Sequence, residues 1–524
     1  MLDTIIRGGN IIDGTNRKKY LADVGIKKDR IVKVGNLGQA TAQNVIEANG
    51  KLVTPGFIDI HNHSDGYWTL FNYPDLPSLI MQGVTTIIGG GSGTSLAPLA
   101  TPETIQAIRR WTNVSEITVN WLTVGDLLEE IERLPLSVNF GTLIGHITLK
   151  RGLIGDQVRD FNAEEYRTAE GMLARGMKEG AFGLSAGMSY SHARFAKTEE
   201  IIRLAKVAAK YSGIFTISLR SETGNLIESV REAVKICRQA GISTEVTQFK
   251  AKGRENWDKF SEAINVLNKA AEEKLNVNFD IYPYSTTGTV LYTYLPDWAT
   301  RGGRDKMLER LKNPNIRPKV VEEMKADVHD YSNLVIAMSS NLAYVGKEVV
   351  SIGEDENIDS EEVVINTLIA SDGQAICFDP ALSEENVKQG LANPLSMIST
   401  DGSGYDDTYS QTGNLVHPRC FGTFPRFLGR YVREQQLMSW EEAIYKITGM
   451  VARKLGLKDR GFIKKDLQAD IVVFNPEVIN DQATFANPYR YPIGISTVLV
   501  NGVPVVQREN PTGQRPGQVL RHSK

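Results

Sequence analysis

Two histidines one residue apart, His61 and His63 in GFIDIHNHSD, are the residues of this sequence best suited to hold a metal ion. Side chains alternate between the two faces of an extended chain, so this pair points to one side. Asp401 in MISTDG adds a carboxylate. Two imidazoles and one carboxylate are a ligand set of catalytic zinc, which leaves a position for a reacting water. The three residues predict a metal-dependent hydrolase, although two histidines bonded to backbone near a turn would give the same motif.

Other polar residues follow strand-like segments in the same way. Arg220 and Glu222 stand in TISLRSE, and Gln248 and Lys250 stand in VTQFKAKG. In a parallel barrel the carboxyl ends of the strands converge on one mouth, so these residues are candidates for the same site. A structural salt bridge would explain Arg220 and Glu222 equally well.

The elements that must position these residues repeat regularly in the middle of the chain. Asn162 and Glu165 form a capping box that starts a helix running to Gly180. Strands are expected to begin near residues 214, 243 and 276, which is one βα unit per roughly 30 residues. This repetition predicts an α/β protein with a TIM-like (β/α)8 barrel, formed by residues 55–285 and 396–459.

Both ends of the chain read as short β-strands with tight turns. The pair Asn501 and Gly502 suits a type I′ hairpin. Because neither short segment can bury a face alone, residues 1–54 and 460–524 are predicted to form one composite β-sandwich. Residues 286–395 break the barrel rhythm with charged helical segments and are predicted to form an inserted lid subdomain.

Composition narrows the functional classes. The 524 residues carry 59 Lys and Arg against 62 Asp and Glu, a net charge of −3, which gives no field favouring nucleic acid or an anionic membrane. No apolar run is long enough to span a membrane. Cys237, Cys377 and Cys420 are odd in number and far apart, which favours reduced thiols and a cytoplasmic location. The expected partner is a small molecule, with monomer and homo-oligomer both left open.

Four weaker candidates have simpler interpretations. GGGSG at residues 89–93 lacks the order of a P-loop or a dinucleotide site, so a glycine-rich turn is the better interpretation. Cys237 lies on the apolar stripe of a helix and is assigned to the core. Cys420 in HPRCFG could line the pocket, but a catalytic thiol is not the favoured interpretation. His192 could contact substrate and is interpreted as a surface residue.

Ten motifs in order make nearly the whole chain resemble the D-aminoacylase (N-acyl-D-amino-acid deacylase) branch of the amidohydrolase superfamily. They are TPGFIDIHNHSD, GVTTIIGGGSG, LIGHITLKRG, GAFGLSAGM, LRSE, DIYPYS, MISTDGSG, HPRCFGTFPRFLGRYVRE, ADIVVFNP and YPIGISTVLVNGVPVV. The resemblance implies a TIM-like barrel, a β-sandwich from both termini and a lid. It also implies zinc-dependent cleavage of a linear amide C–N bond, which releases a carboxylate and a D-amino acid.

Residue by residue, the resemblance makes His61, His63 and Asp401 the metal ligands, with Asp401 also the general base. It implies that Asp401 passes a proton to the leaving nitrogen. The implied substrate-binding residues are Lys250, Tyr282 and Arg220. The roles of His146 and His192 stay open, and Glu222 is a substitute base if Asp401 binds the metal tightly.

The sequence departs from this family at the three ligands of its tightly held zinc, where Ser92, Ser218 and Gln248 stand. Neutral hydroxyl and amide oxygens are poor zinc ligands beside thiolate and imidazole. One explanation is an enzyme with a single metal ion, zinc or another divalent metal. A second is an inactive homologue that binds a ligand or serves in assembly. A third is a deliberate change of the three residues.

Overall fold

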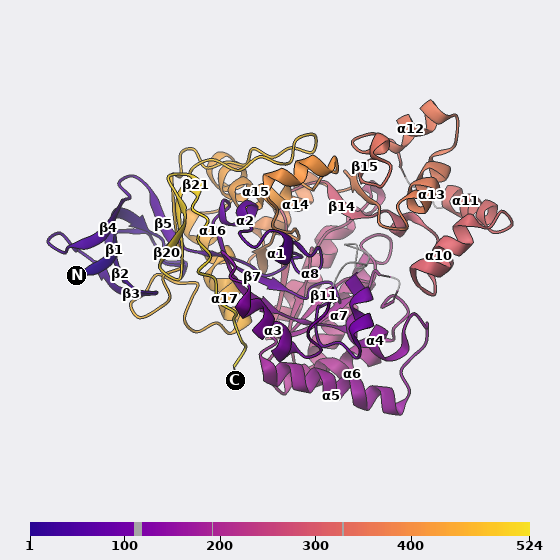
Figure 1. Ribbon diagram of the computed structural model, residues 1–524, viewed down its shortest axis with the longest axis horizontal. Coiled ribbons are helices and arrows are strands. Elements are labelled where there is room, and N and C mark those ends of the chain that lie inside the picture. Colours follow the sequence, from indigo (N-terminus) through magenta and orange to yellow (C-terminus); the bar gives the residue numbers. More distant parts are fainter. Residues whose placement is uncertain (109–117, 191, 327–329, 524) are drawn as a thin grey trace.

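The computed structural model describes residues 1–108, 118–190, 192–326 and 330–523. Three parts follow one another along its long axis (Figure 1). The sheet that contains the N-terminus lies at one end, the helix-covered barrel lies in the middle, and helices α10–α13 lie at the other end.

The barrel consists of parallel strands in two hydrogen-bonded runs. The first run contains β6 (Phe57–Asp59), β7 (Val84–Gly89) and β8 (Asn139–Thr142). The second contains β9 (Ile144–Gly145), β10 (Gly183–Gly187), β11 (Ile214–Ser218), β12 (Ser243–Val246), β13 (Val277–Ile281) and β17 (Ser396–Ile398). Only Leu143 separates β8 from β9, and a parallel bridge between Asn62 and Gly402 joins the ends of β6 and β17. The runs therefore close into the predicted barrel.

Helices surround these strands. The predicted capping box starts α5 (Ala163–Glu179): the Asn162 side chain accepts from the N–H groups of Glu164 and Glu165, and the helix ends at Gly180 with φ 117°. The other main barrel helices are α3 (Val124–Arg133), α4 (His146–Ile154), α6 (Thr198–Ala209), α7 (Leu226–Ala240), α8 (Lys259–Glu272), α14 (Glu384–Ala392), α15 (Arg419–Arg426), α16 (Trp440–Ile447) and α17 (Gly449–Leu455). Cys237 is buried on α7, as predicted.

The two ends of the chain share one nine-stranded sheet. Strand β5 (Leu52–Pro55) pairs antiparallel with β18 (Ile471–Phe474), although more than 400 residues separate them. The other strands are β1 (Leu2–Ile11), β2 (Tyr20–Lys27), β3 (Arg30–Gly35), β4 (Ala42–Glu47), β19 (Ile495–Val500), β20 (Val503–Gln507) and β21 (Asn510–Pro511). Asn501 and Gly502 have φ of 48° and 79°, as the predicted type I′ turn requires. Apolar residues of both ends form one core.

The inserted segment has its own sheet and core. Its strands are β14 (Thr287–Val290), β16 (Ile376–Asp379) and β15 (Val335–Met338), in that order. Its longer helices are α10 (Gly303–Lys312), α11 (Arg317–Ala326), α12 (Val349–Glu356) and α13 (Ser360–Ala370). Helix α14, inside the predicted lid range, instead packs against β13 and β17 and so covers the barrel. None of the described helices has the length and apolar character of a membrane span.

Candidate metal and active site

The barrel mouth brings His61, His63 and Asp401 together. His63 Nε2 lies 3.0 Å from Asp401 Oδ1, and His61 Nε2 lies 3.6 Å from the same oxygen. One ligand atom from each residue lies within 4.8 Å of the others, and all three side chains are buried. Over the described residues, this is the one group of at least three His, Cys, Asp or Glu side chains with metal-site spacing.

Closure of the barrel explains this proximity. The Asp401 N–H donates to the carbonyl of His61 at 3.0 Å, and the His63 N–H donates to the carbonyl of Gly402 at 2.8 Å. The carboxylate of Asp59 accepts from the Thr400 backbone N–H at 2.9 Å and from its hydroxyl at 2.5 Å. Residues 338 positions apart are thus fixed to each other by hydrogen bonds between the ends of β6 and β17.

The charges around the three ligands favour an ionised aspartate. Burial raises the pKa of Asp401, but Arg419, His61 and His63 outweigh burial and hold that pKa well below its usual range. Burial lowers the pKa of His61, yet the carboxylates of Asp280 and Asp401 outweigh it and raise the pKa overall. Burial dominates at His63, whose pKa is lowered. The site therefore places one ionised carboxylate, that of Asp401, beside the imidazoles of His61 and His63.

Arg419 belongs to this site although the sequence analysis gave it no role. Its Nη1 lies 2.9 Å from Asp401 Oδ2, and its guanidinium lies 4.8 Å from the ring centroid of Tyr282. Both partners of the ion pair are less than 10% exposed. The motif HPRCFG contains this arginine, but only the tertiary structure shows that the helix it starts, α15, points it at the end of β17.

Two of the three positions that the sequence analysis assigned to replaced ligands, Ser92 and Ser218, follow one another in a chain of contacts that starts at His61. The Ser92 hydroxyl lies 3.2 Å from His61 Nε2 and 3.1 Å from the Ser218 hydroxyl, which in turn lies 2.9 Å from the Thr247 hydroxyl. The Gln248 N–H donates to Asp280 Oδ1 at 3.0 Å. A buried row of hydroxyl groups therefore continues from His61 across the barrel.

Lys250 and Tyr282 lie beside each other at the ends of β12 and β13. Lys250 Nζ donates to Glu222 Oε1 at 2.6 Å and to the Gln248 carbonyl at 2.8 Å. It lies 6.0 Å from the Tyr282 ring centroid. The buried Tyr282 hydroxyl has no hydrogen-bond partner among the described residues. A polar atom left in this way at a barrel mouth is available to a ligand.

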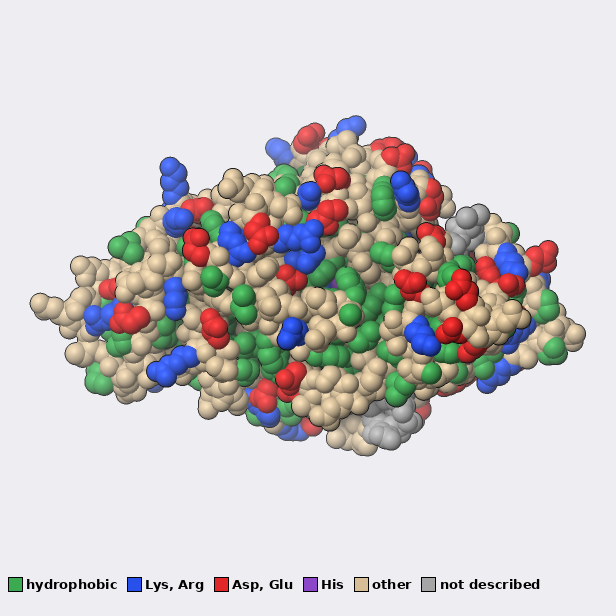
Figure 2. Space-filling model, turned by 90° about the horizontal axis from the view of Figure 1, so that it is seen from above, with side chains coloured by type: hydrophobic (Ala, Val, Ile, Leu, Met, Phe, Trp, Pro, Cys, Tyr) green, Lys and Arg blue, Asp and Glu red, His purple; other side chains and the backbone are tan. Residues whose placement is uncertain are grey.

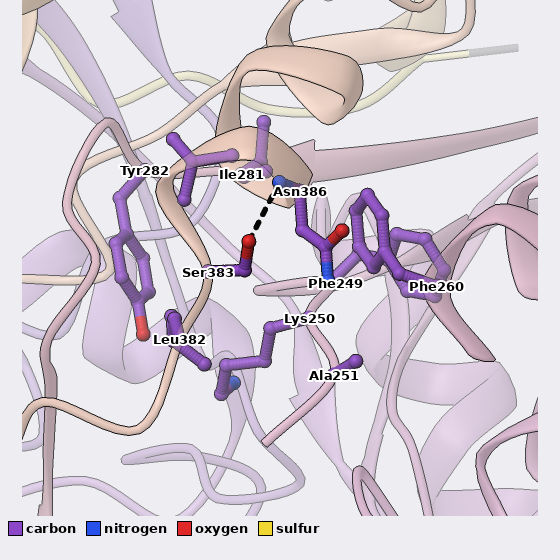
Figure 3. A pocket seen from close by; sticks show the side chains of 10 residues that line it. Phe249, Lys250, Ala251, Phe260, Ile281, Tyr282, Leu382, Ser383 and Asn386 are labelled. Carbon is purple, nitrogen blue, oxygen red and sulfur yellow. Dashed lines mark hydrogen bonds between the residues drawn. The ribbon is translucent and has the colours of Figure 1, made fainter. Parts of the chain in front are cut away.

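A small cavity adjoins this pair (Figure 3). Lys250 and Tyr282 line it together with mainly apolar side chains: Phe249, Ala251, Phe260, Ile281, Leu382 and Val387. Ser383 and Asn386, at the start of α14, complete the lining, and the Asn386 backbone N–H donates to the Ser383 hydroxyl at 3.4 Å.

On the face of the molecule drawn in Figure 2, hydrophobic side chains gather in the middle, between more highly charged regions.

The remaining candidates make contacts elsewhere. Arg220 pairs with Glu232 at 2.7 Å rather than with Glu222, and it also donates to the Ala196 carbonyl at 3.1 Å. Arg220 and Glu222 thus each form a salt bridge, but with other partners: Arg220 with Glu232, and Glu222 with Lys250. His146 bonds to Glu200 and His192 to Asp156, each at 2.7 Å. His192 is half-buried rather than fully on the surface.

Comparison with known proteins places this chain in a family. The sequence pattern of the amidohydrolase family matches residues 44–338 and 360–506, which is most of the chain. The chain belongs to the amidohydrolase family. It is 31% identical over 521 residues to the D-aminoacylase of Alcaligenes xylosoxydans xylosoxydans, covering 99% of this chain and 97% of that relative. The N-acyl-D-aspartate deacylase of the same organism is 30% identical over 519 residues, covering 99% of this chain and 95% of that relative.

Solved structures of amidohydrolases support the same conclusion. The N-acyl-D-glutamate deacylase of Bordetella bronchiseptica, complexed with zinc and a phosphonate inhibitor, superposes with a TM-score of 0.84 at 30% identity, covering 99% of this chain and 100% of that one. A D-aminoacylase structure described as showing one-metal activation and second-metal attenuation gives a TM-score of 0.83 at 30% identity, with both chains fully covered. The predicted resemblance and fold class are confirmed.

Proposed function

We propose that this amidohydrolase cleaves the amide bond of N-acyl-D-amino acids with one divalent metal ion held by His61, His63 and Asp401. The observation that carries the proposal is the convergence of these three buried side chains, with their ligand atoms within 4.8 Å, at the mouth of the barrel. Relatives that share about 30% of the sequence over nearly the whole chain act on N-acyl-D-amino acids by name.

The donor set fits a divalent cation. Two imidazole nitrogens and one carboxylate oxygen are ligands that zinc accepts. The Nδ1 atom of His61 faces Asp280 Oδ1 at 3.4 Å, so a proton on Nδ1 has an anionic neighbour and Nε2 is left to bind the cation. Once bound, the cation supplies Lewis-acid activation of water and of the amide carbonyl.

A single ion is the stoichiometry that the residues support. The second family position offers Ser92 and Ser218, whose neutral hydroxyl groups already bond to each other at 3.1 Å. The backbone N–H of Gln248 bonds to Asp280, and its amide side chain carries no charge. Because zinc favours nitrogen and sulfur donors, this row of hydroxyl groups is a poor second site.

The protein side chains have separate tasks in the proposed reaction. Asp401, kept ionised by Arg419, accepts the proton of the attacking water and passes it to the leaving nitrogen. Lys250 and the hydroxyl of Tyr282, which has no hydrogen-bond partner in the described part of the chain, bind the carboxylate of the substrate. The charge of Arg220 is already paired with Glu232. For Arg220 to bind substrate as well, its side chain would have to leave Glu232.

Turnover with defined substrates tests the proposal. Protein loaded in turn with zinc, manganese, iron or cobalt is expected to release free amino acid from N-acetyl-D-methionine and to leave N-acetyl-L-methionine intact. Free amine is measured by chiral chromatography. If no metal supports turnover of any N-acyl-D-amino acid in a panel, the alternative is favoured, namely a homologue that only binds a ligand. The three positions without a zinc ligand, Ser92, Ser218 and Gln248, support that alternative.

Replacing Lys250 with methionine is expected to raise KM by about tenfold to a hundredfold, because a hydrogen bond to a charged group contributes roughly 1.5–3 kcal/mol. The effect on kcat should be smaller, since the substrate carboxylate does not react. The Lys269→Met variant, on the exposed side of α8, is the matched control and should behave as wild type. A fall in kcat with KM unchanged would contradict the assigned role of Lys250.

A further inference from the structure

His417 is a buried histidine between the lid sheet and the metal site. Its Nδ1 accepts the backbone N–H of Arg419 at 3.0 Å, and its Nε2 lies 3.0 Å from the carbonyl oxygen of Thr286. A carbonyl oxygen can only accept, so Nε2 carries the proton. Because Nδ1 accepts a hydrogen bond, it carries none. The two contacts fix both the tautomer and the orientation of a neutral ring.

Aromatic packing holds this ring in place. Four rings surround it at centroid distances of 5.0–6.1 Å, namely Tyr282, Tyr284, Phe378 and Phe485. Burial lowers the pKa of His417 well below its usual value, and the cations Arg419 and Arg426 lower it further, while Asp401 and the Thr286 carbonyl act in the opposite direction. The ring stays neutral, as the two hydrogen bonds require.

The two contacts of His417 lead to different parts of the molecule. Thr286 immediately precedes β14, the strand through which the chain enters the lid sheet, and Phe378 belongs to β16 of that sheet. Arg419 is the first residue of α15, where a backbone N–H has no partner inside the helix. The guanidinium of Arg419 then reaches Asp401 Oδ2 at 2.9 Å. The imidazole of His417 therefore connects the start of the lid to the guanidinium of Arg419, which faces the proposed general base Asp401.

We propose that His417 is a positioning residue, which holds Arg419 against Asp401 through Nδ1 and connects this pair to the lid through Nε2. The role in turnover rests on the proposed function. Both of these hydrogen bonds join His417 to backbone groups, of Thr286 and Arg419, and neither reaches His61, His63 or Asp401, so we infer that His417 acts through Arg419.

Two conservative variants separate the two nitrogens. In His417→Asn, the side-chain oxygen replaces Nδ1 and can still accept the N–H of Arg419. In His417→Gln, the amide nitrogen replaces Nε2 and keeps only the bond to Thr286. We expect His417→Gln to lower kcat/KM by about tenfold to a hundredfold, the range for residues that orient groups at a metal site, and His417→Asn to restore most of the loss. Equal losses in both variants would overturn the proposal.

A double variant tests whether His417 acts through Arg419. If it does, adding His417→Gln to Arg419→Lys causes no further loss of kcat/KM, because the two changes remove one shared interaction. Multiplied losses would mean that His417 acts by another route. Should His417→Gln not fold, as seen by circular dichroism, the comparison of His417→Asn with Arg419→Lys decides: a loss in the first as large as in the second contradicts the role of Nδ1.

Two further measurements separate this proposal from the proposed function. Zinc affinity, measured by competition with a chromophoric chelator, should weaken about tenfold in His417→Gln and not in His417→Asn. Hydrogen exchange of the peptide covering residues 417–426 should accelerate only in His417→Gln, because the Arg419 amide loses its acceptor. If wild type turns over no substrate, the proposed function fails, while these measurements still decide the role of His417. Identical exchange in the two variants would overturn it.

Discussion

Replacing Asp401 with asparagine is expected to lower kcat/KM for N-acetyl-D-methionine by about 10³-fold, within the range for loss of a general acid–base group. The change removes a negative charge that pairs with Arg419 at 2.9 Å and lies 3.0 Å from His63. It preserves the shape of the side chain. Asp401 has a left-handed backbone with φ 44°, a conformation that asparagine adopts readily, so the variant should fold.

Asp407→Asn is the matched control for this experiment. Asp407 lies six residues along the same loop, is exposed, and should tolerate the change without loss of activity. Steady-state kinetics, metal content and circular dichroism should be measured on both variants. Retention of more than a tenth of wild-type kcat/KM in Asp401→Asn would show that another group moves the proton, and Glu222, which bonds to Lys250, would then be examined first.

The wild-type protein is expected to bind one equivalent of zinc and to lose its activity when the metal is removed by a chelator. Adding back one equivalent should restore activity, and His61→Asn with His63→Asn should prevent both binding and recovery. Metal content by elemental analysis measures the stoichiometry directly. Loss of a residue that only hydrogen-bonds to a metal ligand typically weakens metal binding roughly tenfold to hundredfold. Removing two of the three direct ligands should weaken zinc binding far more.

The triple variant Ser92→Cys, Ser218→His and Gln248→His tests why a single ion is expected. These changes supply a thiolate and two imidazoles next to His61, where a row of hydroxyl groups now lies. The triple variant should bind two equivalents of zinc. If wild type binds two ions, the hydroxyl row is no barrier to a second metal and the mononuclear proposal is wrong. If wild type binds none while the triple variant does, loss of catalysis becomes the better explanation.

Local signals in the sequence were sufficient for much of the fold. The capping box at Asn162 and Glu165 and the glycine at residue 180 set both ends of α5, because they satisfy backbone groups within a few residues of themselves. The strands predicted near 214, 243 and 276 begin at Ile214, Ser243 and Val277. The boundary of the lid was less accessible. The sequence of helix α14 is a charged helical segment like those of the lid helices, and only the packing of α14 on β13 and β17 distinguishes it.

The sequence by itself determined that this protein is an amidohydrolase with a barrel. It also indicated two histidines and one aspartate that could hold a metal. Both conclusions were accessible because strand periodicity and short motifs are local properties of the chain. Only the tertiary structure decided which charges meet. Arg419 faces Asp401, Glu222 pairs with Lys250 and leaves Arg220 to Glu232. These pairs join side chains from different strand ends and helices, and their partners are set by barrel closure and helix packing, which no spacing along the chain encodes.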